Sequence, residues 1–135
     1  MNTEPTDSHY MLLFRGPDWD RGVSREEILR RMDRVMSWFE GLQQRGIVKA
    51  GNPLAHEGRI VSGAGGQAVC DGPFPESKEV IGGYLVIQAA DLNEAVDVAR
   101  KCPTLDFGID IEVRPMLREC PISARLREQE ALAAV

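Results

Sequence analysis

Residues 71–79 read Asp71-Gly72-Pro73-Phe74-Pro75-Glu76-Ser77-Lys78-Glu79, between a strand-like segment and a second, strongly apolar one. The first three residues turn the chain sharply, because glycine tolerates a positive φ and proline fixes its own φ at about −65°. The charged side chains after Phe74 are expected to be solvated and to contribute little as ion pairs. The run therefore predicts a tight turn that leads into a central strand.

Strand and helix patterns alternate on both sides of this turn. A helix is predicted to begin after Ser24, because Glu27 follows at the capping-box spacing and apolar residues then recur every three or four positions up to Leu42. A second helix is predicted between Asp91 and Pro103. Short apolar or alternating runs predict strands at residues 10–14, 47–55, 59–62, 67–71, 82–89 and 109–114.

This order predicts a ferredoxin-like α+β fold, an antiparallel sheet with two helices on one face and an inserted hairpin. The segments 10–14 and 84–87 nevertheless carry apolar side chains on both faces. If the sheet face without helices were exposed to solvent, several hundred Å² of apolar surface would be exposed, on the order of the largest apolar patch found on a typical monomer. We therefore expect a homodimer through the open sheet face, which would complete a dimeric α+β barrel.

A chain of 135 residues is expected to form one domain. We assign residues 1–8 to a disordered N-terminus, 9–117 to the folded domain and 118–135 to a C-terminal appendage with a short helix at 124–132. The net charge of −5 disfavours direct nucleic-acid binding and anionic membranes. Apolar runs are too short to cross a bilayer and no signal peptide is recognisable, so a cytoplasmic location is expected.

The three cysteines have spacings that match neither a disulfide framework nor a zinc site, so free thiols are expected. The two histidines, His9 and His56, form no metal-binding motif with each other. No cofactor and no metal are therefore expected.

Asp71 is the main chemical candidate. Its carboxylate could simply close an Asx-turn, bind a ligand, or act as a general acid or base if apolar neighbours raise its pKa. A pair between His9 and Asp71 is a further hypothesis, since His9 enters the first strand. Ligand-binding candidates beside them are Phe74, Lys78, Tyr84 and Tyr10. Trp19, in a charged loop, is expected to lie over the mouth of a cleft.

The 71–79 run, together with Gly82-Gly83-Tyr84, the segment 90–95 and Glu112-Val113-Arg114-Pro115, resembles the DGPF subgroup of the YCII-related proteins. The resemblance spans residues 9–117 and implies a ferredoxin-like dimeric α+β barrel. It also implies an enzymatic role or an association with transcription initiation and alternative sigma factors. A better-studied branch pairs an aspartate before glycine with a histidine on the first helix. Asp71 matches that aspartate, but the segment 24–45 contains no histidine.

Two functions follow as hypotheses. The first is a dimeric module that binds a small molecule or a protein, such as a sigma factor, in a regulatory role. The second is a small cofactor-independent enzyme that uses Asp71 as general acid or base on a small organic substrate. The lack of a second obvious catalytic group favours the binding module.

Overall fold

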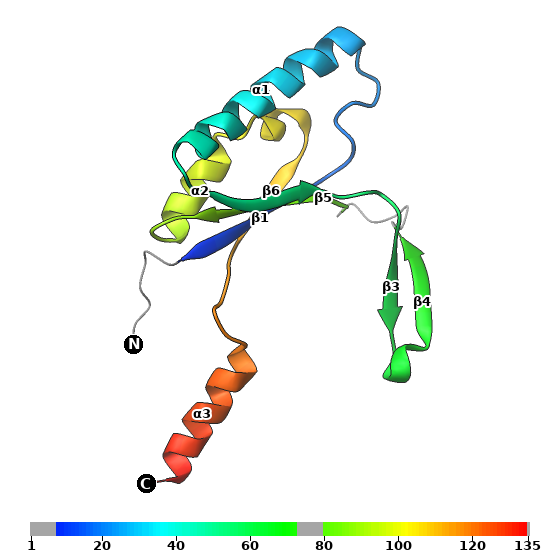
Figure 1. The fold of residues 1–135 in the computed structure, drawn as a ribbon. Coiled ribbons are helices and arrows are strands. Elements are labelled where there is room, and N and C mark those ends of the chain that lie inside the picture. Colours follow the sequence, from blue (N-terminus) through cyan, green and yellow to red (C-terminus); the bar gives the residue numbers. More distant parts are fainter. Residues whose placement is uncertain (1–7, 73–79, 135) are drawn as a thin grey trace.

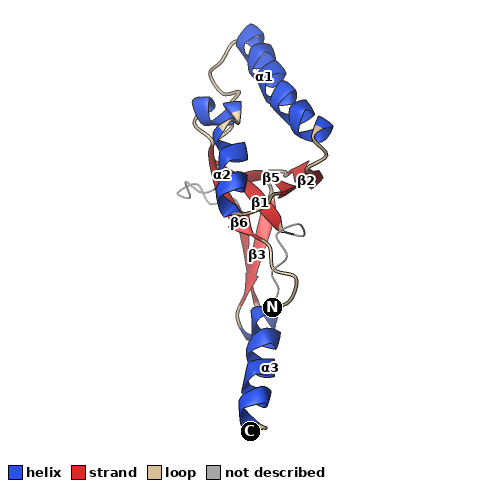
Figure 2. Ribbon diagram, turned by 90° about the vertical axis from the view of Figure 1, so that its left-hand side faces the viewer, coloured by secondary structure: helices blue, strands red, loops and turns tan. Residues whose placement is uncertain are grey.

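The computed structural model describes residues 8–72 and 80–134. Its centre is an antiparallel sheet with the strand order β2-β5-β1-β6 (Figure 1). Helices α1 (Arg25–Gln44) and α2 (Leu92–Arg100) lie on the same face of this sheet (Figure 2). The predicted ferredoxin-like arrangement is therefore confirmed. The strands are β1 (His9–Arg15), β2 (Val48–Pro53), β5 (Ile81–Gln88) and β6 (Asp110–Pro115).

The inserted hairpin is also confirmed. Strands β3 (Gly58–Ser62) and β4 (Ala68–Gly72) pair with each other in a separate sheet and are joined through a short 3₁₀ turn, Ala64–Gly66. The hairpin projects away from the central sheet (Figure 1). Its apolar side chains Ile60, Val61 and Val69 are exposed to solvent.

The core lies between the sheet and the two helices. Leu12 and Ile87, from the two central strands, are completely buried and face Leu42 of α1 and Ala95 of α2. Side chains alternate along a strand, so the neighbours of Leu12 and Ile87 point to the opposite face. The hydrophobic effect thus explains why the most apolar strands, β1 and β5, occupy the middle of the sheet.

Side-chain caps fix the start of both helices. The Glu27 backbone N–H donates to Ser24 Oγ at 3.1 Å, and the Glu94 N–H donates to Asp91 Oδ1 at 2.8 Å. The reciprocal half of the capping box differs between the helices. Glu94 accepts from the Ala90 backbone N–H, whereas the Glu27 carboxylate accepts from two arginine side chains of its own helix.

The face of the sheet opposite the helices carries the apolar side chains that the sequence placed there. Met11 pairs with Val86 and Leu13 pairs with Tyr84 across β1 and β5. β6 contributes charge to the same face, where Arg15 donates to Glu112 at 3.2 Å. The expected alternation of an apolar and a charged face in the last strand is confirmed, with Ile111 and Val113 packed on the core.

The C-terminal appendage contains α3 (Pro121–Ala133), which begins three residues before the predicted helix and ends one after it. It lies apart from the central sheet (Figure 1). Pro121 at the first helical position accounts for the earlier start, because proline needs no hydrogen-bond donor there. None of the described helices is long and apolar enough to cross a membrane.

Candidate functional site

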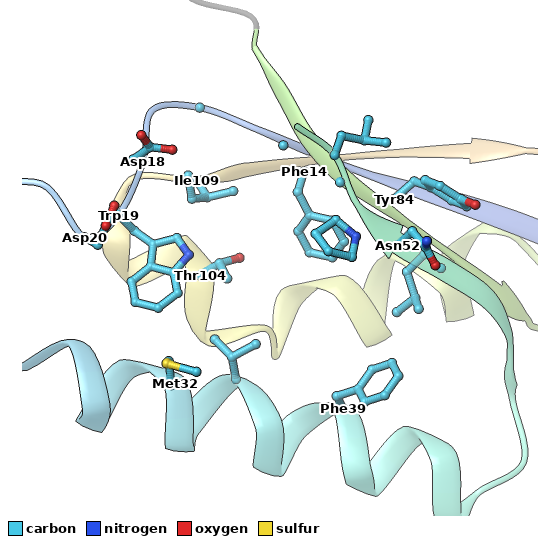
Figure 3. A pocket seen from close by; sticks show the side chains of 18 of the residues that line it. Phe14, Asp18, Trp19, Asp20, Met32, Phe39, Asn52, Tyr84, Thr104 and Ile109 are labelled. Atoms are coloured by element: carbon cyan, nitrogen blue, oxygen red, sulfur yellow. The ribbon is translucent and has the colours of Figure 1, made fainter. Parts of the chain in front are cut away.

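A cavity of about 740 Å³ lies between α1 and the sheet (Figure 3). Met32 and Phe39 project from α1 toward the sheet, and Phe14 projects from β1 toward the helix. Thr104, from the 3₁₀ turn Pro103–Phe107, and Ile109 line the same space. The lining is therefore mostly apolar, with few polar groups.

The apolar side chains that recur every three or four residues along α1 are only partly buried. Leu42, at the C-terminal end of the stripe, is buried in the core, but Met32 and Met36 are 46% and 48% exposed. The middle of the helix, around Met32 and Met36, therefore presents its apolar side chains to a cavity and not to a closed core.

Close backbone packing forms the opposite wall. A Cβ at Gly51 would lie 2.8 Å from Leu85 Cδ1 and 2.9 Å from the Tyr84 carbonyl oxygen. Only glycine fits there, so β2 approaches β5 closely at the cavity wall.

The loop that follows β1, together with His56 from the loop after β2, supplies the cavity rim, which we define as Asp18, Trp19, Asp20 and His56. Gly16 starts this loop at a φ of 148°, and a Cβ there would lie 2.9 Å from the Gly108 carbonyl oxygen. Figure 3 shows Trp19 beside the cavity with Asp18 and Asp20 next to it. The prediction that Trp19 lies at a cleft is confirmed by its place in the lining.

Arg31 of α1 holds this loop in place. Its Nη1 donates to the Trp19 carbonyl oxygen at 2.5 Å, and its Nε donates to Glu27 Oε2 at 3.2 Å. A hydrogen bond from Arg30, and to a smaller extent one from Arg31, keeps the pKa of Glu27 below its usual value. Glu27 therefore stays ionised under ordinary conditions and continues to orient Arg31.

Aromatic contacts fasten the same loop to the turn before β6. The rings of Trp19 and Phe107 lie 5.8 Å apart between centroids, and the Arg31 guanidinium lies 4.6 Å from the Phe107 ring centre. Arg34 donates to Asp106 at 2.6 Å. Trp19 is thus held from two sides, by α1 and by Phe107.

His56 and Asp18 meet at the rim. His56 Nε2 lies 2.7 Å from Asp18 Oδ1, an ion pair when the imidazole is protonated. Arg21 Nε lies 3.3 Å from the other carboxylate oxygen. The imidazole is half-exposed and Asp18 is partly buried, so solvent reaches the pair while both residues line the cavity.

A buried thiol lies behind the cavity wall. Cys102 Sγ and Thr104 Oγ1 are 3.2 Å apart and form a hydrogen bond. Burial raises the pKa of the Cys102 thiol, and the contact with Thr104 only partly opposes this effect. Cys102 is therefore a neutral core residue, whereas Cys70 and Cys120 are exposed.

The residues singled out in the sequence occupy different places. Tyr84 belongs to the cavity wall through its place in β5, although its side chain lies with that of Leu13 on the opposite face of the sheet. Tyr10 is buried in the core and does not belong to the lining. His9 pairs with Gln88 at one end of the central sheet, whereas Asp71 pairs with Arg59 in the hairpin, which projects from the other side (Figure 1). Within one chain these two are not brought together. Phe74 and Lys78 lie outside the described residues.

Sequence reasoning did not single out Asp18 or His56 as a pair. The two lie far apart in the sequence, in loops without a motif, and only the return of β2 beside β5 brings His56 to the loop after β1. Within residues 8–72 and 80–134, no three His, Cys, Asp or Glu side chains gather closely enough to hold a metal ion.

The fold and the site define a ferredoxin-like α+β protein with an apolar cavity between its first helix and its sheet. Residues 10–117 match the model of the YCII-related domain, so the chain belongs to the YCII-related family. An uncharacterised protein of Rhizobium meliloti is 32% identical over 92 residues, which cover 67% of this chain and 74% of that protein. Membership of the DGPF subgroup stays a prediction.

A solved structure with a similar chain path is 5-chloro-2-hydroxyhydroquinone dehydrochlorinase from Burkholderia phenoliruptrix, in complex with 2,5-dihydroxybenzoquinone. It is 15% identical, with a TM-score of 0.45, and the match covers 82% of this chain and 95% of that one. At this level of similarity, the ligand and reaction of that enzyme are properties of that enzyme alone.

Proposed function

We propose that this protein binds a small, largely apolar molecule in the cavity between α1 and the sheet. The observation that supports this proposal is the cavity itself, which has a volume of about 740 Å³ and a mostly apolar and aromatic lining. Sites for small molecules typically have volumes of roughly 300–1,000 Å³ and a few polar groups that orient the ligand. Here those polar groups are Asn52, Thr104 and the acidic and histidine side chains of the rim.

The shape of the lining favours a flat ligand. Phe14, Phe39 and Trp38 present aromatic rings to the cavity, and aromatic rings pack well against other rings in offset or edge-to-face geometry. Met32 and Met36 add flexible, polarisable side chains that can adapt to ligands of different shapes. A molecule with one conjugated ring and few charges therefore fits best.

Both tryptophans of the chain, Trp19 and Trp38, line the cavity, so intrinsic fluorescence reports on its occupancy. We expect para-nitroanisole, an uncharged nitroaromatic that quenches tryptophan, to quench this emission saturably. Replacing Val35 by tyrosine places a ring in the cavity and should weaken binding about tenfold or more, equal to 1.4 kcal/mol.

The matched control is Ser37→Tyr, which adds the same ring to an exposed position of the same helix outside the lining. It should leave the affinity unchanged. Equal quenching of wild type, Val35→Tyr and Ser37→Tyr, or a linear, unsaturable response, would show that the cavity is not the binding site.

A homodimer through the open sheet face accompanies this proposal. Met11, Leu13, Tyr84 and Val86 supply that face with apolar side chains, and a second copy offers the same residues to it. The exposed apolar side chains of the hairpin add to the surface that a partner copy can bury.

Three expectations stay as predictions beside this proposal. Asp71 as a general acid or base is tested by Asp71→Asn once a substrate is identified, with kcat expected to fall about 100-fold or more while the fold is retained. Binding of a regulatory protein such as a sigma factor, implied by the family resemblance, requires a direct binding measurement with that protein. The cytoplasmic location requires fractionation of cells.

A further inference from the structure

At the rim, the imidazole of His56 lies beside the carboxylate of Asp18. His56 Nε2 faces Asp18 Oδ1 at 2.7 Å. A carboxylate beside one ring nitrogen favours the tautomer that carries its proton on that nitrogen. The other nitrogen, Nδ1, then keeps its lone pair, and no described residue forms a hydrogen bond with it. His56 is therefore arranged to accept a proton at Nδ1.

The Asp18 side of the pair is held firmly. Its neighbour Trp19 accepts the hydrogen bond from Arg31 and contacts Phe107, so the loop is tied to α1 and to the turn before β6. The charged groups that face His56 from this loop are Asp18 itself, Arg21 behind it and Asp20 in the lining. Once His56 gains a proton, the Asp18 carboxylate stabilises the imidazolium.

We propose that His56, positioned by Asp18, removes the proton from a weakly acidic hydroxyl group on a conjugated apolar ligand, such as a phenol or an enol, bound in the cavity. This inference rests on the proposed binding function. In this step the ligand O–H bond breaks and an N–H bond forms at Nδ1. The electron pair of the O–H bond stays on the ligand oxygen, and an imidazolium and a ligand oxyanion result.

The charges of the rim select this class of ligand. Asp18 and Asp20 disfavour a ligand that arrives as a full carboxylate anion, because like charges repel at short range. A phenol or enol arrives neutral and becomes an anion only after its proton has moved to His56. Its conjugated body matches the aromatic lining, and its hydroxyl group matches the imidazole of the rim.

The probe for this step is para-nitrophenol, whose ionised form absorbs visible light. At a pH at which the free probe is mostly protonated, wild-type protein should raise the absorbance of the ionised form on binding. His56→Gln should lower the ratio of ionised to protonated bound probe about tenfold, equal to one unit in the pKa of the probe. Asp18→Asn should lower the same ratio, because Asp18 is a positioning residue for His56.

Para-nitroanisole, which has no proton to lose, separates binding from proton transfer. His56 is exposed, so His56→Gln should retain the fold, and its affinity for para-nitroanisole measures any loss of binding separately from proton transfer. Failure of wild type to bind para-nitroanisole would contradict the proposed function, and the further inference with it. If wild type binds para-nitroanisole but not para-nitrophenol, or if wild type and His56→Gln ionise the bound para-nitrophenol equally, the further inference alone is overturned.

Discussion

Single residues set the chemistry around the cavity. Cys102 lies behind its wall, beside the lining residue Thr104, and burial raises the pKa of the Cys102 thiol. A thiol reacts through its thiolate, so a raised pKa lowers the reactive fraction at any given pH. Cys70 and Cys120 are exposed to solvent.

We therefore predict two fast-reacting thiols and one slow one. At mildly alkaline pH, a disulfide reagent such as Ellman's reagent should modify Cys70 and Cys120 rapidly and Cys102 only after the protein is unfolded. Rapid modification of all three thiols in the folded protein would contradict the buried position of Cys102.

Replacing each of two glycines by alanine should change the free energy of unfolding in opposite directions. Gly16 combines a positive φ with a close carbonyl neighbour, so Gly16→Ala should lower the free energy of unfolding by about 1–3 kcal/mol. Gly41, within α1, has open space around its Cα, and Gly41→Ala should raise stability by about 0.5–1 kcal/mol. Denaturant unfolding measures both changes. If both variants change the free energy of unfolding in the same direction, the described conformation of the loop after β1 is contradicted.

At the scale of elements, local patterns predicted most of what the structure contains. The caps at Ser24 and Asp91, the alternation in β6 and the inserted hairpin all follow from neighbouring residues. The cavity did not follow, because the stripe of α1 has the same period whether it meets a closed core or an open space. The pairing of His56 with Asp18 depends on sheet register and could not be read from spacing.

The cap of α2 gives an element-scale prediction. Asp91→Ala removes the side-chain acceptor of the Glu94 N–H and should cost about 1 kcal/mol, or roughly 3–5 °C in Tm. Asp97→Ala, an exposed change in the same helix with no capping role, should stay within about 0.5 kcal/mol of wild type. If both variants melt alike, the cap does not hold the start of α2.

For the whole molecule, the arrangement of layers places the cavity and the open sheet face on opposite sides of the sheet. Helices cover the face with the cavity, and the opposite face carries Met11, Leu13 and their cross-strand neighbours. Dimerisation through the open face would therefore leave the space between α1 and the sheet available to a ligand.

Light scattering tests this assembly. We expect wild type to have twice the chain mass of 15.0 kDa at micromolar concentration. Met11→Glu places a charge on the open face and should shift the protein toward the monomer, because a buried unpaired charge is costly. Ser37→Glu, with the same charge on an exposed part of α1, should remain dimeric. A wild-type mass of one chain would exclude the dimer.

Methionine methyl NMR tests the binding cavity most directly. Met32 and Met36 line the cavity, whereas Met11 lies on the opposite face and Met116 follows β6. On titration with para-nitroanisole, we expect the methyl signals of Met32 and Met36 to shift saturably and together, while those of Met11 and Met116 stay in place. Shifts at Met11 or Met116 without any at Met32 and Met36 would contradict a ligand site between α1 and the sheet.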